Sequence, residues 1–215
     1  MRKITVAILA ACLLLCSASI FAQKSSGEQS KKSSPDEVYA GLLGKLKAGD
    51  PLVDYQQLRI SWADSKAREE AKDTSAEAKA MFAELRAEHY EKALASAMTV
   101  IGQEYINADA HFVAYAALKE LHRDLESQFQ LTVFHGLVKS ILDSGDGKKM
   151  ETAWLVVDTD EEYLVLRVLG LKVGSQSLRG KDGHSYDELD VHDPKSGNDL
   201  KLFFNIDISM RHMGI

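Results

Sequence analysis

LVKSILDSGDGKKMETAWLVVD, residues 137–158, is the stretch that decides the fold. Before it, apolar residues recur at three- and four-residue steps, the spacing of one helix face. Within it, Ser144-Gly145-Asp146-Gly147-Lys148 interrupts that spacing with residues that favour turns. After it, short β-branched or aromatic runs are bounded by turn residues, which is typical of strands. The sequence therefore predicts an α+β fold with the helices first and the sheet last.

The helical part is expected to span residues 36–143. Ser34-Pro35-Asp36-Glu37 supplies a cap, a first-turn proline and early acids, so it predicts a helix start. A second short helix should begin at Asp54, and residues 63–74 are polar enough to form a loop. From Thr74 to Leu142 the chain is almost wholly helical by pattern. Breaks are predicted near residues 87–89, 105–109 and 125–127. This part should therefore form antiparallel helical hairpins.

Two small residues suggest a repeat within these hairpins. Ala93 and Ser127 are 34 residues apart, each early in the second helix of a pair. Small residues let helices approach closely, and 34 is the tetratricopeptide period. The tryptophan, glycine and proline landmarks of such repeats are absent. Two tetratricopeptide-like units and simple helical hairpins therefore both fit the pattern.

The sheet part is expected to span residues 150–208 and to be antiparallel. Leu200, Leu202, Phe204, Ile206 and Ile208 alternate with Lys201, Phe203, Asn205 and Asp207, as in a strand with one buried face. Residues 181–184 and 193–198 have the composition of hairpin turns. The predicted strands are 153–158, 163–169, 175–178, 186–191 and 200–208. Such a sheet needs cover for its apolar face, most simply from the helices.

The first 22 residues have the layout of a secretory signal peptide. Arg2 and Lys3 precede an uncharged apolar run that ends at Phe21, and Ala22 offers a small residue for cleavage. Residues 23–35 then read as a flexible linker. A retained membrane anchor and a lipoprotein processed at Cys12 are the alternatives. Continuation of the apolar run beyond Cys12 favours soluble export to the periplasm or the medium.

Export changes the composition of the mature chain, residues 36–215 of which should form one domain. Cys12 and Cys16 both lie in the signal, which excludes disulfides and thiolate chemistry. The full chain has 26 basic and 32 acidic residues, so loss of Arg2 and Lys3 leaves 24 against 32 and a charge of −8. No basic cluster offsets this balance. We therefore expect no nucleic-acid partner and no charge-driven lipid attachment.

No motif predicts catalysis, a metal or a cofactor. Residues 145–148 lack the spacing of a phosphate-binding loop, and no two histidines have the i, i+4 spacing of a helical zinc site. Asp158, Asp160, Glu161 and Glu162 read as a solvated acidic turn between two strands, without EF-hand spacing. The sequence thus favours a non-catalytic role without a cofactor.

Five segments of the sequence together resemble those of a known family. They are 54–59 (DYQQLR), 105–111 (YINADAH), 140–148 (SILDSGDGK), 161–163 (EEY), and 186–187 (YD) leading to 203–206 (FFNI). They look like an exported bacterial family catalogued only as a domain of unknown function. The resemblance covers about residues 36–208. It implies export and the order of helices and sheet, but no catalytic residue and no cofactor.

These segments also suggest a polar cleft between the helices and the sheet, where ligands commonly bind. Its candidate residues are Arg59, Asn107, Asp109, His111, Ser144, Asp146 and Lys148. The competing interpretation makes Asn107 and Asp109 helix caps, Asp146 a turn residue, and Arg59 the partner of a buried acid.

Two classes of function follow. The first is a protein- or peptide-binding module that uses an exposed groove within residues 74–142, with another envelope protein or a peptide as partner. The alternative is a small-molecule binder or hydrolase that uses the cleft. It requires a deep pocket in which His111 reaches a carboxylate or Ser144. The sequence does not specify the oligomeric state.

Overall fold

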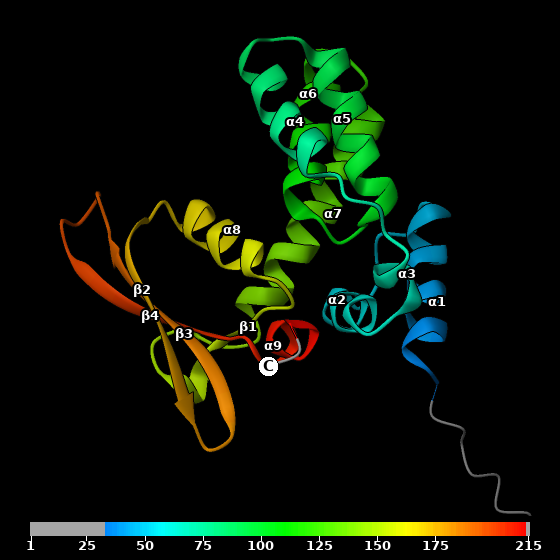
Figure 1. The fold of residues 1–215 in the computed structure, drawn as a ribbon. Helices are drawn as coiled ribbons and strands as arrows, with labels where there is room; N and C mark the ends of the chain where they lie inside the picture. Colours follow the sequence, from blue (N-terminus) through cyan, green and yellow to red (C-terminus); the bar gives the residue numbers. More distant parts are fainter. Residues whose placement is uncertain (1–32, 214–215) are drawn as a thin grey trace, which may run out of the picture. The chain divides into compact units, whose positions relative to one another are not determined.

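The structure, a computed structural model, describes residues 33–213, and the predicted signal peptide lies outside them. Helices precede a four-stranded sheet, as predicted (Figure 1). The elements before the sheet are α1 (Pro35–Lys47), α2 (Tyr55–Ala63), α3 (Lys66–Glu69), α4 (Ser75–Arg86), α5 (Tyr90–Gln103), α6 (Ala108–Glu120), α7 (Asp124–Leu142) and the 3-10 helix η1 (Met150–Thr152). Consecutive helices α4 to α7 pack against one another. The fold is therefore α+β.

Capping residues set most of the helix boundaries. Ser34 and Glu37 form a reciprocal capping box at α1, and Pro35 is the first helical residue. Asp54 caps α2 through the backbone N–H of Gln57. The breaks predicted near residues 87–89 and 105–109 are confirmed. The third break was misplaced at 125–127, because α6 ends at Glu120 and α7 begins at Asp124.

The sheet is mixed rather than purely antiparallel, which corrects the prediction. Its strands are β1 (Trp154–Leu155), β2 (Lys172–Lys181), β3 (His184–His192) and β4 (Asp199–Asn205), in the spatial order β1-β4-β3-β2. The last three form the expected antiparallel meander, with turns at the two predicted places. The short β1 pairs in parallel with β4, Trp154 opposite Phe204. This parallel pairing is possible because α8, β2 and β3 separate the two strands in the chain.

Residues 163–169 form a helix, so the predicted strand there was wrong. They belong to α8 (Thr159–Leu169), which begins at its cap Asp158 and ends at Gly170 in the left-handed conformation. The predicted acidic turn is thus the capped first turn of this helix. Short apolar runs do not distinguish a strand from a buried helix. Here Asp158 caps the start of a helix, and the three consecutive residues Leu164, Val165 and Leu166 are all buried, without the alternation of a half-buried strand.

The ends of the sheet also differ from the prediction. The strand predicted over 153–158 keeps only two residues, and the strand predicted over 200–208 stops at Asn205. The Asn205 side chain accepts a hydrogen bond from the backbone N–H of Asp207, 3.1 Å away. This contact starts the last helix, α9 (Asp207–Met213). Asn205, the last residue of β4, therefore forms a side-chain turn that leads into α9.

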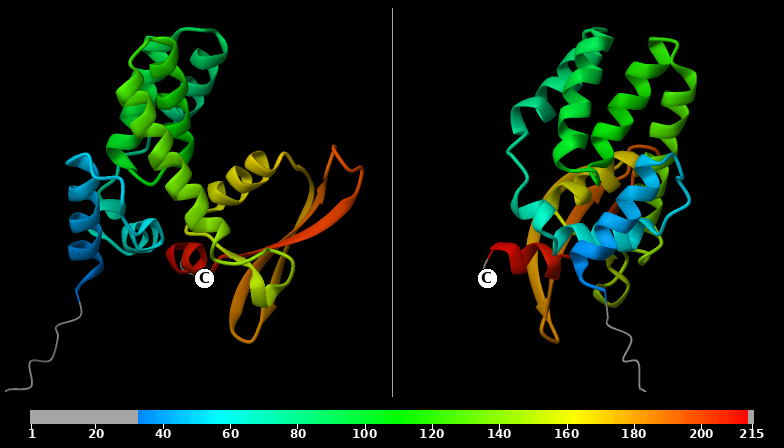
Figure 2. Two further views of the ribbon diagram at one scale, coloured as in Figure 1. Left: turned by 180° about the vertical axis from the view of Figure 1, so that it is seen from behind. Right: turned by 90° about the vertical axis from the view of Figure 1, so that its right-hand side faces the viewer.

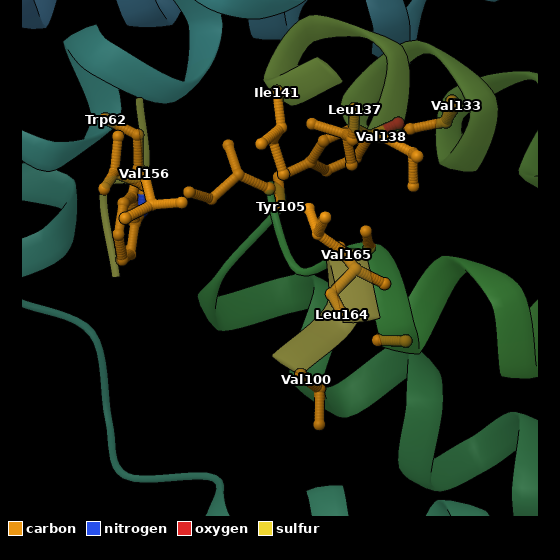
Figure 3. Close-up of a cluster of buried hydrophobic side chains, with 14 of the residues drawn as sticks. Trp62, Val100, Tyr105, Val133, Leu137, Val138, Ile141, Val156, Leu164 and Val165 are labelled. Atoms are coloured by element: carbon orange, nitrogen blue, oxygen red, sulfur yellow. The ribbon is translucent and has the colours of Figure 1, made fainter. Parts of the chain in front are cut away.

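The hydrophobic core connects the helices with the sheet through α7 and α8. Val133, Leu137 and Ile141 form one buried stripe of α7. Figure 3 shows this stripe close to Leu164 and Val165 of α8. Figures 1 and 2 show α8 lying over one face of the sheet. α8 therefore packs between the sheet and the helical part, so its polar residues can face both.

Candidate functional site

A groove runs between α4, the α5–α6 junction and α8. Its largest cavity has a volume of about 690 Å³, and the lining includes Phe82, Arg86, Asn107, Asp160, Tyr163 and Arg167. Cavities of about 330 Å³ and 370 Å³ share walls with it at either end. We call this continuous depression, from Trp62 to Phe134, the α8 groove. Its walls come from segments far apart in the sequence.

Helix starts place carboxylates in the middle of the α8 groove. Asn107 caps α6 by accepting from the backbone N–H of Ala110, and Asp158 caps α8 through Asp160. Acids are favoured in the first turn of a helix because they oppose the helix dipole. Asp109 and Asp160 occupy such positions and both line the groove. Local capping therefore creates an acidic centre from two different helices.

Two carboxylates at this centre carry no cationic partner within residues 33–213. Glu104 accepts a hydrogen bond from the Asn107 side chain at 3.1 Å, and Asp160 forms no ion pair. Burial, together with the negative charges of Asp158, Glu161 and Asp160, raises the pKa of Glu104 to about 7. Burial and the neighbouring Asp158 and Asp109 also raise the pKa of Asp160. Negative charges therefore crowd at Glu104 and Asp160, while Lys79, Arg86 and Arg167 add cations to the wall of the central cavity.

The two ends of the groove differ in chemistry. At one end Phe82, Phe112, Phe134 and Val168 line the 370 Å³ cavity, and Phe112 is 39% exposed. Its ring lies 5.4 Å from that of Phe134, centroid to centroid. Aromatic walls around a cavity are a common feature of ligand sites. This apolar end can accept an aromatic or aliphatic group.

The other end contains hydrogen-bond donors without acceptors. Trp62 lines the 330 Å³ cavity, is only 4% exposed, and its indole N–H has no acceptor within the described chain. Nη1 of Arg68 is likewise buried without an acceptor, while Nη2 lies 3.5 Å from Asp158. The guanidinium stacks 5.1 Å from the centre of the Trp62 ring. Unsatisfied buried donors are uncommon in folded proteins. Both nitrogen atoms are enclosed by the protein, so they belong to the buried wall at this end of the groove.

The residues predicted from sequence fall into three places. Asn107 and Asp109 line the α8 groove, where Asp109 pairs with Arg167. Arg59 and His111 are fully buried. Ser144, Asp146 and Lys148 lie at the α7–β1 junction and line none of the cavities of the groove. The structure does not gather the seven residues into one cleft.

Arg59 forms the centre of a buried polar cluster. Its Nε and Nη2 donate to the two carboxylate oxygens of Glu161 at 2.7 and 2.5 Å. The guanidinium also donates to the Ser140 hydroxyl and to the carbonyl of Leu155. A further bond runs from the backbone N–H of Val157 to Glu161. Arg59 is therefore the partner of a buried acid and joins α2, α7, β1 and α8.

His111 is also fully engaged. Its Nε2 lies 2.8 Å from the carbonyl oxygen of Tyr105 and its Nδ1 lies 2.6 Å from Oε1 of Gln130. Burial lowers the pKa of His111, which favours the neutral ring. Neither a carboxylate nor Ser144 is a partner of this ring. The hydrolase hypothesis required one of them, so this geometry argues against it.

The α7–β1 junction is a self-contained turn. The Ser144 hydroxyl donates to the carbonyl of Ile141 and accepts from the backbone N–H of Leu155. Asp146 accepts from the backbone N–H of Lys148 and from the Thr152 hydroxyl. Gly147 has φ +66 and faces the Trp154 ring, so a side chain would be excluded there. These polar residues shape the turn and leave little capacity for a ligand.

Next to Glu161, one further buried carboxyl has a different environment. Glu162 is fully buried, and neither of its side-chain oxygens accepts a hydrogen bond in the part of the chain that the structure describes. Burial, the negative charge of Asp187 and a hydrogen bond that the protonated Glu162 carboxyl donates to Asp187 raise the pKa of Glu162 to about 9. Asp187 in turn accepts from Gln176, which accepts from the hydroxyl of Tyr163. Glu162 is therefore neutral at pH 7 and lies outside the groove.

Sequence reasoning missed most of the α8 groove. Trp62, Arg68, Phe82, Glu104 and Arg167 gave no motif, because their segments meet only in the folded chain. One signal was present: the acids after Asp158 follow a capping residue, which also predicts a helix start.

Among residues 33–213, no group of three His, Cys, Asp or Glu side chains is arranged to hold a metal ion. In the same range, no helix combines the length and hydropathy needed to cross a membrane.

The fold and the groove define an α+β protein with a charged, partly apolar groove beside the helix that covers its sheet. A family model described as Domain of unknown function (DUF4919) matches residues 28–213, so the chain belongs to this family. The predicted resemblance to a family catalogued as a domain of unknown function is confirmed. No curated protein and no solved structure matched the chain.

Proposed function

We propose that this chain is an exported protein that binds a peptide in the α8 groove without catalysis. The observation that carries the proposal is the continuity of the groove, which presents an apolar end and a charged centre in one depression. An extended peptide presents apolar side chains, charged side chains and backbone groups along its length, so it can contact the different parts of this groove. Adjacent helical hairpins commonly form such peptide-binding surfaces.

The tetratricopeptide-like packing is part of this proposal. Ala93 and Ser127 are buried, and the Ser127 hydroxyl donates to the carbonyl of Tyr115 in the preceding helix. Small buried residues at both positions support close helix packing. The groove uses α4 and α6 from this region together with α8, which lies outside it.

Peptide display tests the binding proposal. The protein, residues 23–215, is used to select from a random 12-residue library, together with Phe112→Ser and the control Leu125→Ser. Leu125 is 90% exposed on α7, away from the groove cavities. We expect enrichment of peptides with an aromatic or aliphatic residue, lost in Phe112→Ser and kept in the control. Equal enrichment with both variants, or none with the parent, would overturn the proposal.

Export is tested separately by sequencing the amino terminus of the protein recovered from its own host. Export with cleavage after Ala22 predicts a mature chain that begins at Gln23. A chain that begins at Cys12 with a lipid attached would identify the lipoprotein alternative. An uncleaved chain in the membrane fraction would identify the retained anchor.

A further inference from the structure

We infer that the α8 groove binds the carboxyl terminus of a peptide, with the terminal carboxylate on Arg86 and an apolar last side chain in the adjoining aromatic end. This inference rests on the proposed peptide binding and specifies which part of the peptide the groove recognises. Arg86 is the last residue of α4, is exposed, and lines the central cavity of about 690 Å³. The apolar cavity of about 370 Å³ adjoins it.

Arg86 differs from the other arginines of residues 33–213 because it has no acidic partner there. Each of the others forms an ion pair with an aspartate or a glutamate; they are Arg59, Arg68, Arg123, Arg167, Arg179 and Arg211. Acids outnumber bases by 32 to 26 in the whole chain, so an arginine without an acid beside it is the exception. A guanidinium presents a planar fork of N–H donors that matches a carboxylate. Arg86 can therefore bind an anionic ligand in the cavity that it lines.

Phe82, one helical turn before Arg86, connects the two cavities. It lines both the 690 Å³ cavity and the 370 Å³ cavity. Side chains at positions i and i+4 of a helix have Cβ atoms about 5 to 6 Å apart. A ligand that reaches Arg86 can therefore place an apolar group against Phe82. Phe112 and Phe134 form further walls of the same apolar cavity.

A carboxyl-terminal residue fits this spacing better than an acidic side chain does. The terminal carboxylate and the side chain of the last residue are bonded to the same Cα atom, so the two groups lie side by side. In an extended peptide, neighbouring side chains point to opposite faces, and residues two positions apart are about 7 Å from each other. An internal acid beside an apolar residue therefore matches Arg86 and Phe82 less well.

The charges along the groove favour the same direction of the peptide. Lys79 adds a second cation to the wall of the 690 Å³ cavity, two helical turns before Arg86. Glu104 and Asp160 crowd negative charge in the 330 Å³ cavity, where a carboxylate would be repelled. The terminal carboxylate therefore belongs near Arg86, and the rest of the peptide extends toward the 330 Å³ cavity.

The experiment compares free and blocked carboxyl termini. Acetylated hexapeptides of glycine and serine carry phenylalanine at position 6 or at position 3, each prepared with a free and with an amidated carboxyl terminus. Immobilised protein, residues 23–215, captures them from an equimolar mixture, and mass spectrometry measures the ratio of free to amidated peptide retained. An amidated peptide with glutamate next to phenylalanine, and acetylphenylalanine as a competitor, complete the set.

We expect the free peptide with terminal phenylalanine to be retained about tenfold more than its amide, the effect of one charge-assisted hydrogen-bonded contact. The ratio should stay near one when phenylalanine is at position 3. Arg86→Gln should reduce the ratio for terminal phenylalanine toward one, and Arg86→Lys should keep part of it because the charge remains. The matched control Arg123→Gln removes an exposed arginine outside the groove cavities and should leave the ratio unchanged.

Urea unfolding of the same variants separates binding from helix stability. An arginine in the last turn of a helix also interacts favourably with the helix dipole. If Arg86 had only this role, Arg86→Gln would lower the midpoint of unfolding and leave the retention ratio unchanged. That result would overturn the inference.

Equal retention of the free and amidated peptides, with both lost in Phe112→Ser, would overturn the inference and leave the proposed function standing. Retention of no peptide would overturn both. Retention of the amidated glutamate peptide at the level of the free one would show that an acidic side chain suffices and overturn the inference. Displacement by acetylphenylalanine at equal concentration would assign the site to small carboxylates and overturn it as well.

Discussion

Two regions of this protein contain buried or partly buried carboxylates, and they differ in whether those carboxylates have a charged partner. At Arg59 and Glu161, inside the junction of α2, α7 and α8, five hydrogen bonds satisfy both charged groups. In the α8 groove, Glu104 and Asp160 form no ion pair within residues 33–213. The hydrogen bonds of the first region are internal and hold the fold together. The carboxylates of the second region line a cavity, where a ligand can reach them.

The largest expected effect on stability comes from removing the hydrogen bonds between Arg59 and Glu161. Arg59→Ala should lower the free energy of unfolding by about 3 to 5 kcal/mol, because it leaves Glu161 buried and unpaired. Urea unfolding followed by circular dichroism measures this value. The double variant Arg59→Met, Glu161→Leu should lose less than Arg59→Ala alone, since no charge is left behind. A loss below about 1 kcal/mol for Arg59→Ala would show that the cluster does not hold the fold.

The next effect on stability concerns Glu162, the buried neighbour of Glu161 whose carboxyl oxygens accept no hydrogen bond in the described chain. Its folded pKa of about 9 lies above its value in an unfolded chain, so its stabilising contribution is present below pH 4.5 and is lost as the pH rises toward 9. Glu162→Gln cannot ionise and removes this loss. The variant should therefore gain stability relative to the parent between pH 5 and pH 9, by about 1 to 3 kcal/mol. Urea unfolding at pH 5 and pH 9 measures this gain. The same difference in free energy of unfolding between variant and parent at both pH values would contradict the neutral, buried state of Glu162.

A smaller effect is expected for the pH dependence of binding. The pKa of Glu104 is raised to about 7, so its negative charge develops as the pH rises from 6 to 8. Affinity for a peptide with lysine side chains should rise over this range, because lysine stays protonated while Glu104 becomes negative. Glu104→Gln should remove the rising limb. Fluorescence anisotropy with a labelled hexapeptide measures the profile, and a flat profile for the parent would exclude Glu104 from the site.

The smallest effect on stability is expected within the groove. Arg167 is 51% exposed and pairs with Asp109, while Arg123 is 47% exposed and pairs with Glu126. Arg167→Ala and Arg123→Ala should each lower the free energy of unfolding by at most about 1 kcal/mol, as exposed ion pairs do. Only Arg167→Ala should change peptide affinity in anisotropy titrations. Equal affinity for the two variants would remove Arg167 from the binding surface.

Local signals predicted much of the fold. The caps at Ser34 and Asp54 and the turns at 181–184 and 193–198 could be identified because each depends on neighbouring residues. The strand expected at 163–169 was wrong because an apolar run that short suits a buried helix equally well. The cap at Asp158 was the competing signal. Boundaries set by contacts within a few residues were thus predictable, and the helix or strand identity of a short buried run was not.

The candidate site was predictable only in part. Asn107 and Asp109 line the α8 groove, because the α5–α6 junction that positions them is locally coded. Glu161 and Glu162 are adjacent and identical in type, yet one pairs with Arg59 and the other remains neutral. That difference depends on residues about 100 positions away and cannot be obtained from spacing alone. The same holds for Trp62 and Asp160, which line the same cavity although they are far apart in the sequence.

The two tryptophan side chains offer the most direct test of the groove as a peptide site. Trp62 lines one end of the groove and its indole N–H is buried without an acceptor in the described chain, whereas that of Trp154 donates to the carbonyl of Gly145 at 3.1 Å. In a ¹H–¹⁵N spectrum each gives one indole signal. Titration with a peptide selected by display should move the Trp62 signal and leave the Trp154 signal in place. Movement of the Trp154 signal alone would place the peptide at the α7–β1 junction and contradict the account.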